Sequence, residues 1–293
     1  MIQYLENDLL KIAVSTSGAE LQGIENKRTG QQYLWNGDAR FWKRRSPVLF
    51  PIVGALWNGK THFDGVEFAI GQHGFARDME FTPVPDAPEG ELWFALESSD
   101  ATMKLFPRSF RLEIGYGLHD TRITVMWRVI NTGSGTLHFQ IGAHPAFNLP
   151  DFNTGDPIHG YFAVSASDLT AEIIAEKGCI GSETAVVSTD NEQMIPVTAD
   201  TFCRDALIFG NHQLGRVSLL DKQRQPVLTL LFRTPYVGLW APAADAPFVC
   251  IEPWYGRADA VGFNGEFSER HAINTLEAGK TFDASYMIII DNF

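Results

Sequence analysis

Residues 112–129 read LEIGYGLHDTRITVMWRV, and this stretch decides the fold class. Apolar side chains occupy every second position of 112–118 and again of 123–129, and residues 119–121 (His-Asp-Thr) separate the two runs. Alternation with a period of two turns one face of an extended chain toward a core and leaves the other face partly exposed. The stretch therefore predicts a β-hairpin of two half-buried strands.

Similar signals continue on both sides of this hairpin. Within 61–70, Asp64-Gly65 lies between alternating segments and indicates a second hairpin, because Asp-Gly tolerates the positive φ angles of a tight turn. Helical patterns are nearly absent, and 99–105 is long enough for only one or two turns. Further strands are predicted at residues 9–14, 92–96, 137–141, 161–164, 217–220, 227–232, 237–240, 248–252 and 286–290.

Many short strands without helices predict an all-β protein, a large antiparallel β-sandwich. Such sandwiches often exceed about two hundred residues as one unit, so we expect a single domain over residues 1–293. The hydrophobic share of 45% is ample for a large core. An open stack of sheets also offers a concave face on which a ligand can lie across several strands.

Composition indicates which cell compartment and which partners to expect. The formal net charge of −12 disfavours nucleic acid as a partner. Charged residues interrupt the N-terminal segment, and no apolar run approaches the length of a membrane span, so neither a signal peptide nor a membrane helix is predicted. Cys179, Cys203 and Cys250 form no C-x-x-C pair, which favours free thiols in a reducing compartment. We therefore expect a cytoplasmic monomer or homodimer with no nucleic-acid or membrane partner.

Glu252 is the polar residue whose position most needs an explanation. With a period of two, it shares a strand face with Phe248, Cys250 and Trp254. A carboxylate on such a face is costly unless it is paired or hydrogen-bonded. Desolvation raises the pKa of a carboxyl group toward neutrality, which suits a general base.

Two histidines lie in segments that are otherwise apolar or glycine-containing. His144 ends a predicted strand, and Pro145 stiffens the turn that follows, so a histidine held there can deliver a proton near neutral pH. Gly74 removes side-chain bulk beside His73, which lets the backbone approach a ligand. The alternatives are a core His144 bonded to a backbone carbonyl and a loop His73 without a ligand.

Three arginines and one aspartate complete the candidate set. Arg44 and Arg45 precede a buried-looking run, so either one of them turns inward to hold ligand oxygens or both are solvated. Arg77 is a further donor unless it only forms a surface pair with Asp78. Asp205 is a weaker candidate, because it could simply cap a turn.

Patterns typical of cofactor sites are missing from the sequence. No two histidines have i, i+4 spacing, no acidic loop of the calcium type is present, and there is no glycine-rich phosphate loop. The sequence therefore predicts neither a metal nor a cofactor.

Taken together, these segments resemble the aldose 1-epimerase family, of galactose mutarotase-like fold. The likeness runs along almost the whole chain, and the order and spacing of the motifs make it specific. It is carried by SGAEL at 17–21, YLW at 33–35, SPVLFPIVG at 46–54, HGFAR at 73–77, GAHPAF at 142–147, DALIF at 205–209 and CIEPW at 250–254.

The resemblance implies an isomerase, an aldose 1-epimerase, with the sugar on the concave face of the sandwich. It implies that Glu252 is the general base and His144 the general acid, and the Glu252 carboxylate is expected to favour protonated His144. His73 would donate a hydrogen bond near the ring oxygen. Asp205 would accept hydrogen bonds from sugar hydroxyls, and Arg45 or Arg77 would donate to sugar oxygens.

The resemblance also bears on the substrate. The galactose-specific branch has an Asn–Arg pair near the position of Arg44-Arg45, and the HGFAR run at 73–77 instead resembles the branch that acts on hexose 6-phosphates. The substrate is therefore an aldose or, with an arginine phosphate pocket, a hexose 6-phosphate. Two rival functions stay open: glycoside hydrolysis with Asp205 and Glu252 as the two carboxylates, and a non-catalytic carbohydrate-binding or regulatory protein on the same fold.

Overall fold

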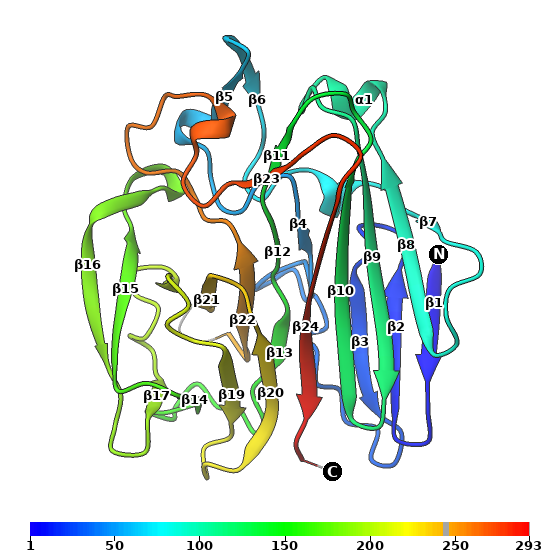
Figure 1. The fold of residues 1–293 in the computed structure, drawn as a ribbon. Coiled ribbons are helices and arrows are strands. Elements are labelled where there is room, and N and C mark those ends of the chain that lie inside the picture. Colours follow the sequence, from blue (N-terminus) through cyan, green and yellow to red (C-terminus); the bar gives the residue numbers. More distant parts are fainter. Residues whose placement is uncertain (243–245, 293) are drawn as a thin grey trace.

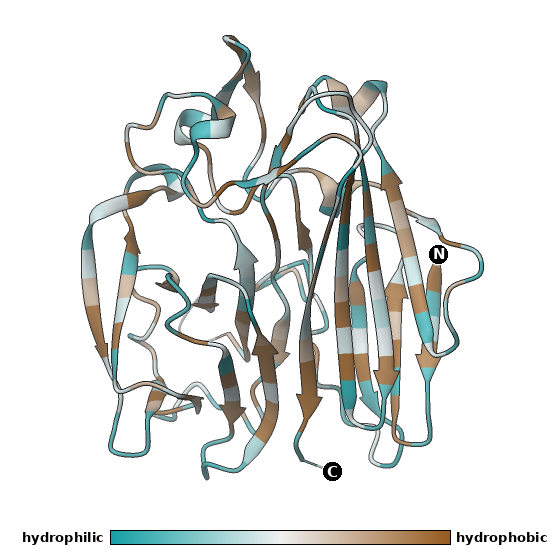
Figure 2. Ribbon diagram, in the orientation of Figure 1, coloured by the Kyte–Doolittle hydropathy of each residue, from teal (hydrophilic) through white to brown (hydrophobic). Residues whose placement is uncertain are grey.

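The computed structural model describes residues 1–242 and 246–292, which form antiparallel sheets with only short helices between them (Figure 1). The hairpin predicted first is present as β9 (Phe110–His119) and β10 (Arg122–Asn131). Brown and pale or teal residues alternate along these strands in Figure 2, as the period of two requires. The predicted all-β fold class is confirmed.

The hairpin lies in a nine-stranded sheet. Its order is β17-β14-β19-β20-β24-β10-β9-β8-β7. The other strands of this sheet are β7 (Thr82–Pro83), β8 (Glu91–Glu97), β14 (Gly160–Val164), β17 (Met194–Val197), β19 (Arg216–Leu220), β20 (Pro226–Phe232) and β24 (Thr281–Ile290).

An eight-stranded sheet carries the residues of functional interest. Its order is β16-β15-β18-β21-β22-β12-β4, and β13 also pairs with β22. Its strands are β4 (Val48–Leu49), β12 (Ile141–Ala143), β13 (Ala146–Asn148), β15 (Asp168–Ile174), β16 (Ile180–Ser188), β18 (Leu207–Phe209), β21 (Tyr236–Trp240) and β22 (Phe248–Tyr255).

Smaller elements complete the molecule. One three-stranded sheet and two strand pairs comprise β1 (Ile2–Glu6), β2 (Leu10–Ser15), β3 (Leu21–Asn26), β5 (Lys60–Phe63), β6 (Val66–Ala69), β11 (Leu137–Phe139) and β23 (Asn274–Leu276). The helices are α1 (Asp100–Met103) and four 3₁₀ turns, η1 (Trp57–Gly59), η2 (Ala76–Asp78), η3 (Glu176–Gly178) and η4 (Phe267–Glu269). No helix among the described residues is long and apolar enough to span a bilayer.

The main core lies between the two large sheets. Val249 and Ile251 of β22 belong to the same buried cluster as Leu230 of β20 and Ile288 of β24. At the end of β22, the ring of Tyr255 packs edge-on against Trp127 of the opposite sheet, with centroids 6.3 Å apart. One face of β22 is therefore sealed, and its alternate residues point to the other face of the eight-stranded sheet.

The structure corrects several of the predicted strand boundaries. The predicted strand at 137–141 is two strands in different sheets, because the buried Gln140 side chain between them accepts from the Val53 N–H and donates to the His271 carbonyl. The predicted strand at 248–252 continues to Tyr255. The strands β1, β3, β15 and β16 were not predicted; alternation is weak in β3 and β16, whereas β15 does alternate, with Leu169, Ala171 and Ile173 on its buried face. The three cysteines are free thiols, as predicted.

Candidate active site

Strand register places His144 directly across from Glu252. Gly142 of β12 pairs with Trp254 of β22, and Ala146 of β13 pairs with Cys250. The residues between these pairs follow the same register, although Pro145 has no N–H with which to continue the ladder. His144 and Glu252 are therefore cross-strand neighbours on one face, and His144 Nε2 lies 3.1 Å from Glu252 Oε2.

Two glycines make room for the side chain next to this pair. A Cβ atom on Gly142 would lie 2.6 Å from the Trp254 indole, and a Cβ atom on Gly238 would lie 2.5 Å from its other end. Gly238 itself pairs with Glu252 in the neighbouring strand β21. The indole therefore lies flat across the neighbouring strands, beside Glu252.

A cavity of about 430 Å³ opens over this face. Its lining crosses β15, β18, β21 and β22, and includes segments that are not in the sheet. Three tryptophans line it, namely Trp42, Trp240 and Trp254. The titratable side chains that line it are Arg44, His73, Arg77, His144, Asp205 and Glu252.

His73 is held by the backbone in one tautomer. The ring Nδ1 of His73 accepts a hydrogen bond of 3.1 Å from the Gly54 N–H, and the backbone N–H of His73 donates to the Gly54 carbonyl at 2.8 Å. Because Nδ1 is an acceptor, the proton of the neutral ring must lie on Nε2. The loop can adopt this shape because Gly74 has a φ of +73°, and a Cβ atom there would lie 2.1 Å from the Phe50 carbonyl oxygen.

Burial controls the protonation of all three residues. It raises the pKa of Glu252 well above the usual value, and the charge of Asp205 adds to this effect, while the Trp254 indole opposes it. Burial lowers the pKa of His144, and the charges of Arg77 and Arg44 lower it further. The pKa of His73 is also lowered, mainly by burial. Burial and the two arginine charges therefore oppose the protonated His144 that was expected beside Glu252, because desolvation favours the uncharged pair.

The arginines divide between the cavity and the scaffold. Arg44 and Arg77 both line the cavity, whereas Arg45 does not: its guanidinium donates to the Gln22 carbonyl. Arg44 also forms an ion pair of 2.8 Å with Asp78, which is 61% exposed. Burial and the charge of Arg44 lower the pKa of Arg77 to about 10, so Arg77 stays protonated at neutral pH beside a second cation. This geometry does not support the predicted contact of Arg45 with a sugar.

Asp205 contributes a second carboxylate to the same cavity. It has a φ of +73°, and its Oδ1 accepts from the Ala206 N–H at 2.8 Å. This local bond matches the turn-capping alternative, yet the residue also lines the cavity and acts electrostatically on Glu252. Asp205 therefore caps a turn and also faces the cavity.

The aromatic wall of the cavity was not predicted. Trp42 stacks on the His144 ring with centroids 4.7 Å apart, and Trp240 meets the same ring edge-on at 5.4 Å. The signal in the sequence was Trp42, which precedes Arg44 by two residues in a segment already singled out for its arginines. Aromatic residues in a loop carry no periodicity, so a pattern-based search overlooks them.

One group of possible metal ligands occurs among residues 1–242 and 246–292. His144, Cys250 and Glu252 each place a ligand atom within 4.8 Å of the others. However, His144 and Glu252 already face each other, and burial raises the pKa of the Cys250 thiol well above the usual value, so it stays protonated. This set of side chains suits the exchange of a proton better than the binding of a cation.

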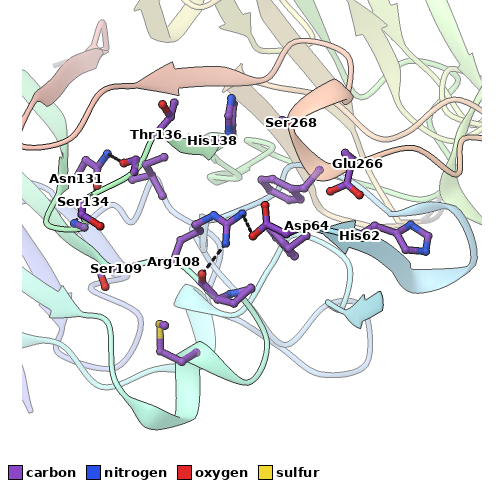
Figure 3. A pocket seen from close by; sticks show the side chains of 17 residues that line it. His62, Asp64, Arg108, Ser109, Asn131, Ser134, Thr136, His138, Glu266 and Ser268 are labelled. Atoms are coloured by element: carbon purple, nitrogen blue, oxygen red, sulfur yellow. Dashed lines mark hydrogen bonds and ion pairs between the residues drawn. The ribbon is translucent and has the colours of Figure 1, made fainter. Parts of the chain in front are cut away.

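A second cavity, of about 510 Å³, lies away from these residues, near β5, β11 and η4 (Figure 3). Figure 3 shows that its polar side chains are partly engaged with one another, as in the ion pair of 3.0 Å between Arg108 and Asp64. None of the predicted site residues lines it. All of them except Arg45 instead line the cavity that contains His144 and Glu252.

Comparisons with known proteins agree with this fold. Residues 1–272 match the family model described as aldose 1-epimerase. The chromosomal protein LacX of Lactococcus lactis is 27% identical to this chain over 301 residues, covering 98% of this chain and 99% of LacX.

Solved structures show the same relationship in three dimensions. A galactose mutarotase related enzyme from Lactobacillus acidophilus superimposes with a TM-score of 0.92 at 29% identity, over 100% of this chain and 98% of its own. A galactose mutarotase-like protein from Lactobacillus casei also has a TM-score of 0.92, at 27% identity, over 99% of this chain and 100% of its own.

Proposed function

This chain belongs to the aldose 1-epimerase family, and from that premise we propose that it is a mutarotase, which interconverts the α and β anomers of an aldose. The observation that carries the proposal is the contact of 3.1 Å between His144 and Glu252 inside a cavity of sugar size. In an aldose hemiacetal, the C1 hydroxyl oxygen and the ring oxygen are both bonded to C1. A base and an acid that serve these two oxygens must therefore lie side by side.

Ring opening transfers two protons in opposite directions. Glu252 takes the proton of the C1 hydroxyl, His144 gives a proton to the ring oxygen, and the bond between C1 and the ring oxygen breaks to leave an aldehyde. After rotation about the C1–C2 bond, the ring hydroxyl attacks the other face of the aldehyde. Both protons then return, and the opposite anomer forms with no net change in the protein.

The directions in which burial shifts the pKa values of Glu252 and His144 indicate which protonation states the cavity favours. Ring opening starts from the ionic form of the pair, in which Glu252 is ionised and His144 is protonated, and it leaves both groups uncharged. Burial raises the pKa of Glu252 and lowers that of His144, so it favours the uncharged pair. Burial therefore favours the two proton transfers that open the ring, whereas the ionic pair must first form by transfer of a proton from Glu252 to His144, which are 3.1 Å apart.

The other polar groups have supporting roles in this proposal. The His73 Nε2–H, fixed by the Gly54 N–H on the other nitrogen, donates to the sugar near the ring oxygen. Asp205 accepts hydrogen bonds from sugar hydroxyls, and Arg77 donates to a sugar oxygen. Acid–base groups placed in this way typically contribute about 10²–10⁴-fold each.

The purified protein should accelerate the equilibration of anomers without changing the composition of the sugar. The reason is that the two proton transfers need no other reactant. The measurement is the optical rotation of freshly dissolved α-anomers of a panel of aldoses at neutral pH, with a chelator in half of the samples. The rate should be the same with and without the chelator.

Three results would contradict this proposal. Release of a new reducing end from a glycoside would favour hydrolysis by Asp205 and Glu252. Saturable binding of sugar with no acceleration for any aldose would favour a non-catalytic carbohydrate-binding protein. A rate that falls with the chelator and returns with a divalent ion would show that a metal takes part.

A second candidate substrate class is the hexose 6-phosphates, and one observation favours it. Arg44 and Arg77 both line the cavity, and their side chains are 19% and 16% exposed. The Arg77 Nε–H is buried and has no hydrogen-bond partner in the described structure, although Asp78 Oδ2 lies 3.9 Å away as a long ion pair, the surface pair given as the alternative for Arg77. In a chain of net charge −12, two neighbouring cations offer a local attraction for an anionic sugar.

Arg77→Ala should lower kcat/KM for glucose 6-phosphate by roughly ten- to a hundredfold, because a charge-assisted hydrogen bond is lost. The value for glucose should change far less. The measurement compares both sugars in the wild type, in Arg77→Ala and in Arg40→Ala, whose arginine is exposed and pairs only with Asp38. Equal losses for both sugars in Arg77→Ala, or a wild type that prefers glucose, would contradict a phosphate site.

A further inference from the structure

Trp42 ends a row of stacked rings that leads from the core to His144. The ring centroids of Trp35 and Phe248 lie 4.5 Å apart, those of Phe248 and Trp42 lie 6.1 Å apart, and those of Trp42 and His144 lie 4.7 Å apart. The corresponding interplanar angles are 26°, 24° and 29°, so the rings are nearly parallel. Trp35 and Phe248 are buried at the base of the row.

We propose that Trp42 is a positioning residue, whose indole holds the His144 ring in the plane in which Nε2 faces Glu252. This inference rests on the proposed function, because it assigns a role in the same proton transfer. Trp42 itself exchanges no proton.

The histidine lacks the anchor that usually fixes such a ring. A catalytic or metal-binding imidazole commonly donates its second N–H to a carboxylate or a carbonyl group, which sets the ring orientation. His144 Nδ1 is buried and has no such partner among the described residues. Its backbone N–H donates to the Pro47 carbonyl at 3.1 Å, which places the main chain but does not fix the ring about χ2. Beyond the contact of Nε2 with Glu252, the restraint comes from the faces and edges of neighbouring rings.

The segment that carries Trp42 is itself anchored. The Trp35 indole N–H donates to the Trp42 carbonyl at 2.8 Å, and the Asp38 carbonyl accepts from the N–H groups of Phe41 and Trp42, each at 3.0 Å. Hydrogen bonds thus hold the backbone of Trp42, and stacking holds the face of its indole. Trp240 touches the same imidazole only edge-on, at an interplanar angle of 83°, and cannot oppose rotation in the same way.

The face contact also has an electrostatic consequence during the reaction. The electron-rich face of an indole attracts a cation, so it stabilises the imidazolium form of His144. The charged and titratable groups around this ring are Glu252 and Cys250 from β22, His73 and Arg77 from the η2 segment, and Arg44. The two arginines disfavour the imidazolium form, and Trp42 partly offsets them.

The test compares Trp42→Ala and Trp42→Phe with Phe41→Leu. Phe41 lies in the same segment but contacts Trp35 rather than His144, so it controls for general loosening of the loop. Trp42→Ala should lower kcat by about ten- to a hundredfold with KM changed less than about threefold, because a small misplacement of a catalytic group is costly. Trp42→Phe should recover most of kcat, and Phe41→Leu should retain it.

Two readouts distinguish positioning from a mere contribution to stability. In Trp42→Ala, the acid limb of the kcat–pH profile should move to lower pH by up to about one unit, because the face contact with the imidazolium is lost. Independently of activity, the fluorescence difference between wild type and Trp42→Phe should titrate with His144 and should be flat in the His144→Ala background. This second readout is unaffected if the protein proves not to be a mutarotase.

Three results would overturn the proposal. A raised KM with kcat unchanged in Trp42→Ala would identify the indole as a platform for the sugar. An unshifted pH profile would show that it does not act on His144. Equal losses in Trp42→Ala and Phe41→Leu would reduce its role to holding the loop.

Discussion

Glu252→Gln should reduce kcat for mutarotation by at least about a hundredfold, the typical loss when a general base is removed. Glutamine keeps the shape of the side chain and its place opposite His144, but it cannot accept the proton of the C1 hydroxyl. KM should change little, because the hydrogen bonds to the other hydroxyls remain. The measurement is the initial rate of anomer equilibration at several sugar concentrations, in parallel with His144→Ala.

The double variant is the sharper control. If Glu252 and His144 act as one proton-transfer unit, combining Glu252→Gln with His144→Ala should cost clearly less than the product of the two single losses. Strict multiplication would indicate that the two side chains serve separate steps. Near-normal turnover of Glu252→Gln would remove the assignment of the base.

Arg270→Met should lower the free energy of unfolding by about 3–5 kcal/mol, because it leaves a buried charge without its partner. Arg270 Nε and Asp259 Oδ1 lie 2.6 Å apart, and the two side chains are 0% and 1% exposed. Arg270 also donates to Gln140 Oε1 at 2.9 Å, and Asp259 Oδ2 accepts from the Trp57 N–H at 3.0 Å. The pair thus ties the segment after β22 to the segment before β5. Reversible unfolding in urea, followed by tryptophan fluorescence, measures the change.

A paired substitution separates the charge from the packing. Arg270→Met combined with Asp259→Leu removes both charges, so it should recover much of the lost stability. If the double variant is as unstable as Arg270→Met, the loss comes from the packing and hydrogen bonds of arginine. If Arg270→Met alone is neutral, the buried pair contributes nothing to stability.

The fold class could be predicted because its signal is local. The alternation in β9 and β10 is strong, since one face of each strand is buried against other sheets. β16 was not predicted for the opposite reason: it is an edge strand whose residues are mostly exposed, so polar and apolar residues are mixed on both of its faces. The break at Gln140 is likewise invisible in sequence, because the partners of its amide, Val53 and His271, are far away along the chain.

The site was predictable where the polarity of a residue differs from that of its neighbours in the sequence. Glu252 is one polar residue in an apolar strand, and the structure buries it fully. The choice between Arg44 and Arg45 needed coordinates, because consecutive residues in a loop do not follow a fixed alternation. The role suggested for Trp42 also needed them, since it depends on a ring from another part of the chain lying parallel to the indole.

The residues that line the cavity stand on two kinds of backbone, the strands of a sheet and irregular segments, which should differ in how easily they unfold locally. Glu252 lies on β22, which is hydrogen-bonded to β21 on one side and to β12 and β13 on the other. Trp42 and Arg44 lie in a segment outside the sheets, and His73 precedes the 3₁₀ turn η2. Amide hydrogens in a central strand exchange with solvent mainly when the whole molecule unfolds, whereas those of an irregular segment exchange through smaller openings. We therefore expect slow amide exchange around Glu252 and faster exchange around Trp42, Arg44 and His73, so a ligand bound in the cavity should add protection mainly in those irregular segments.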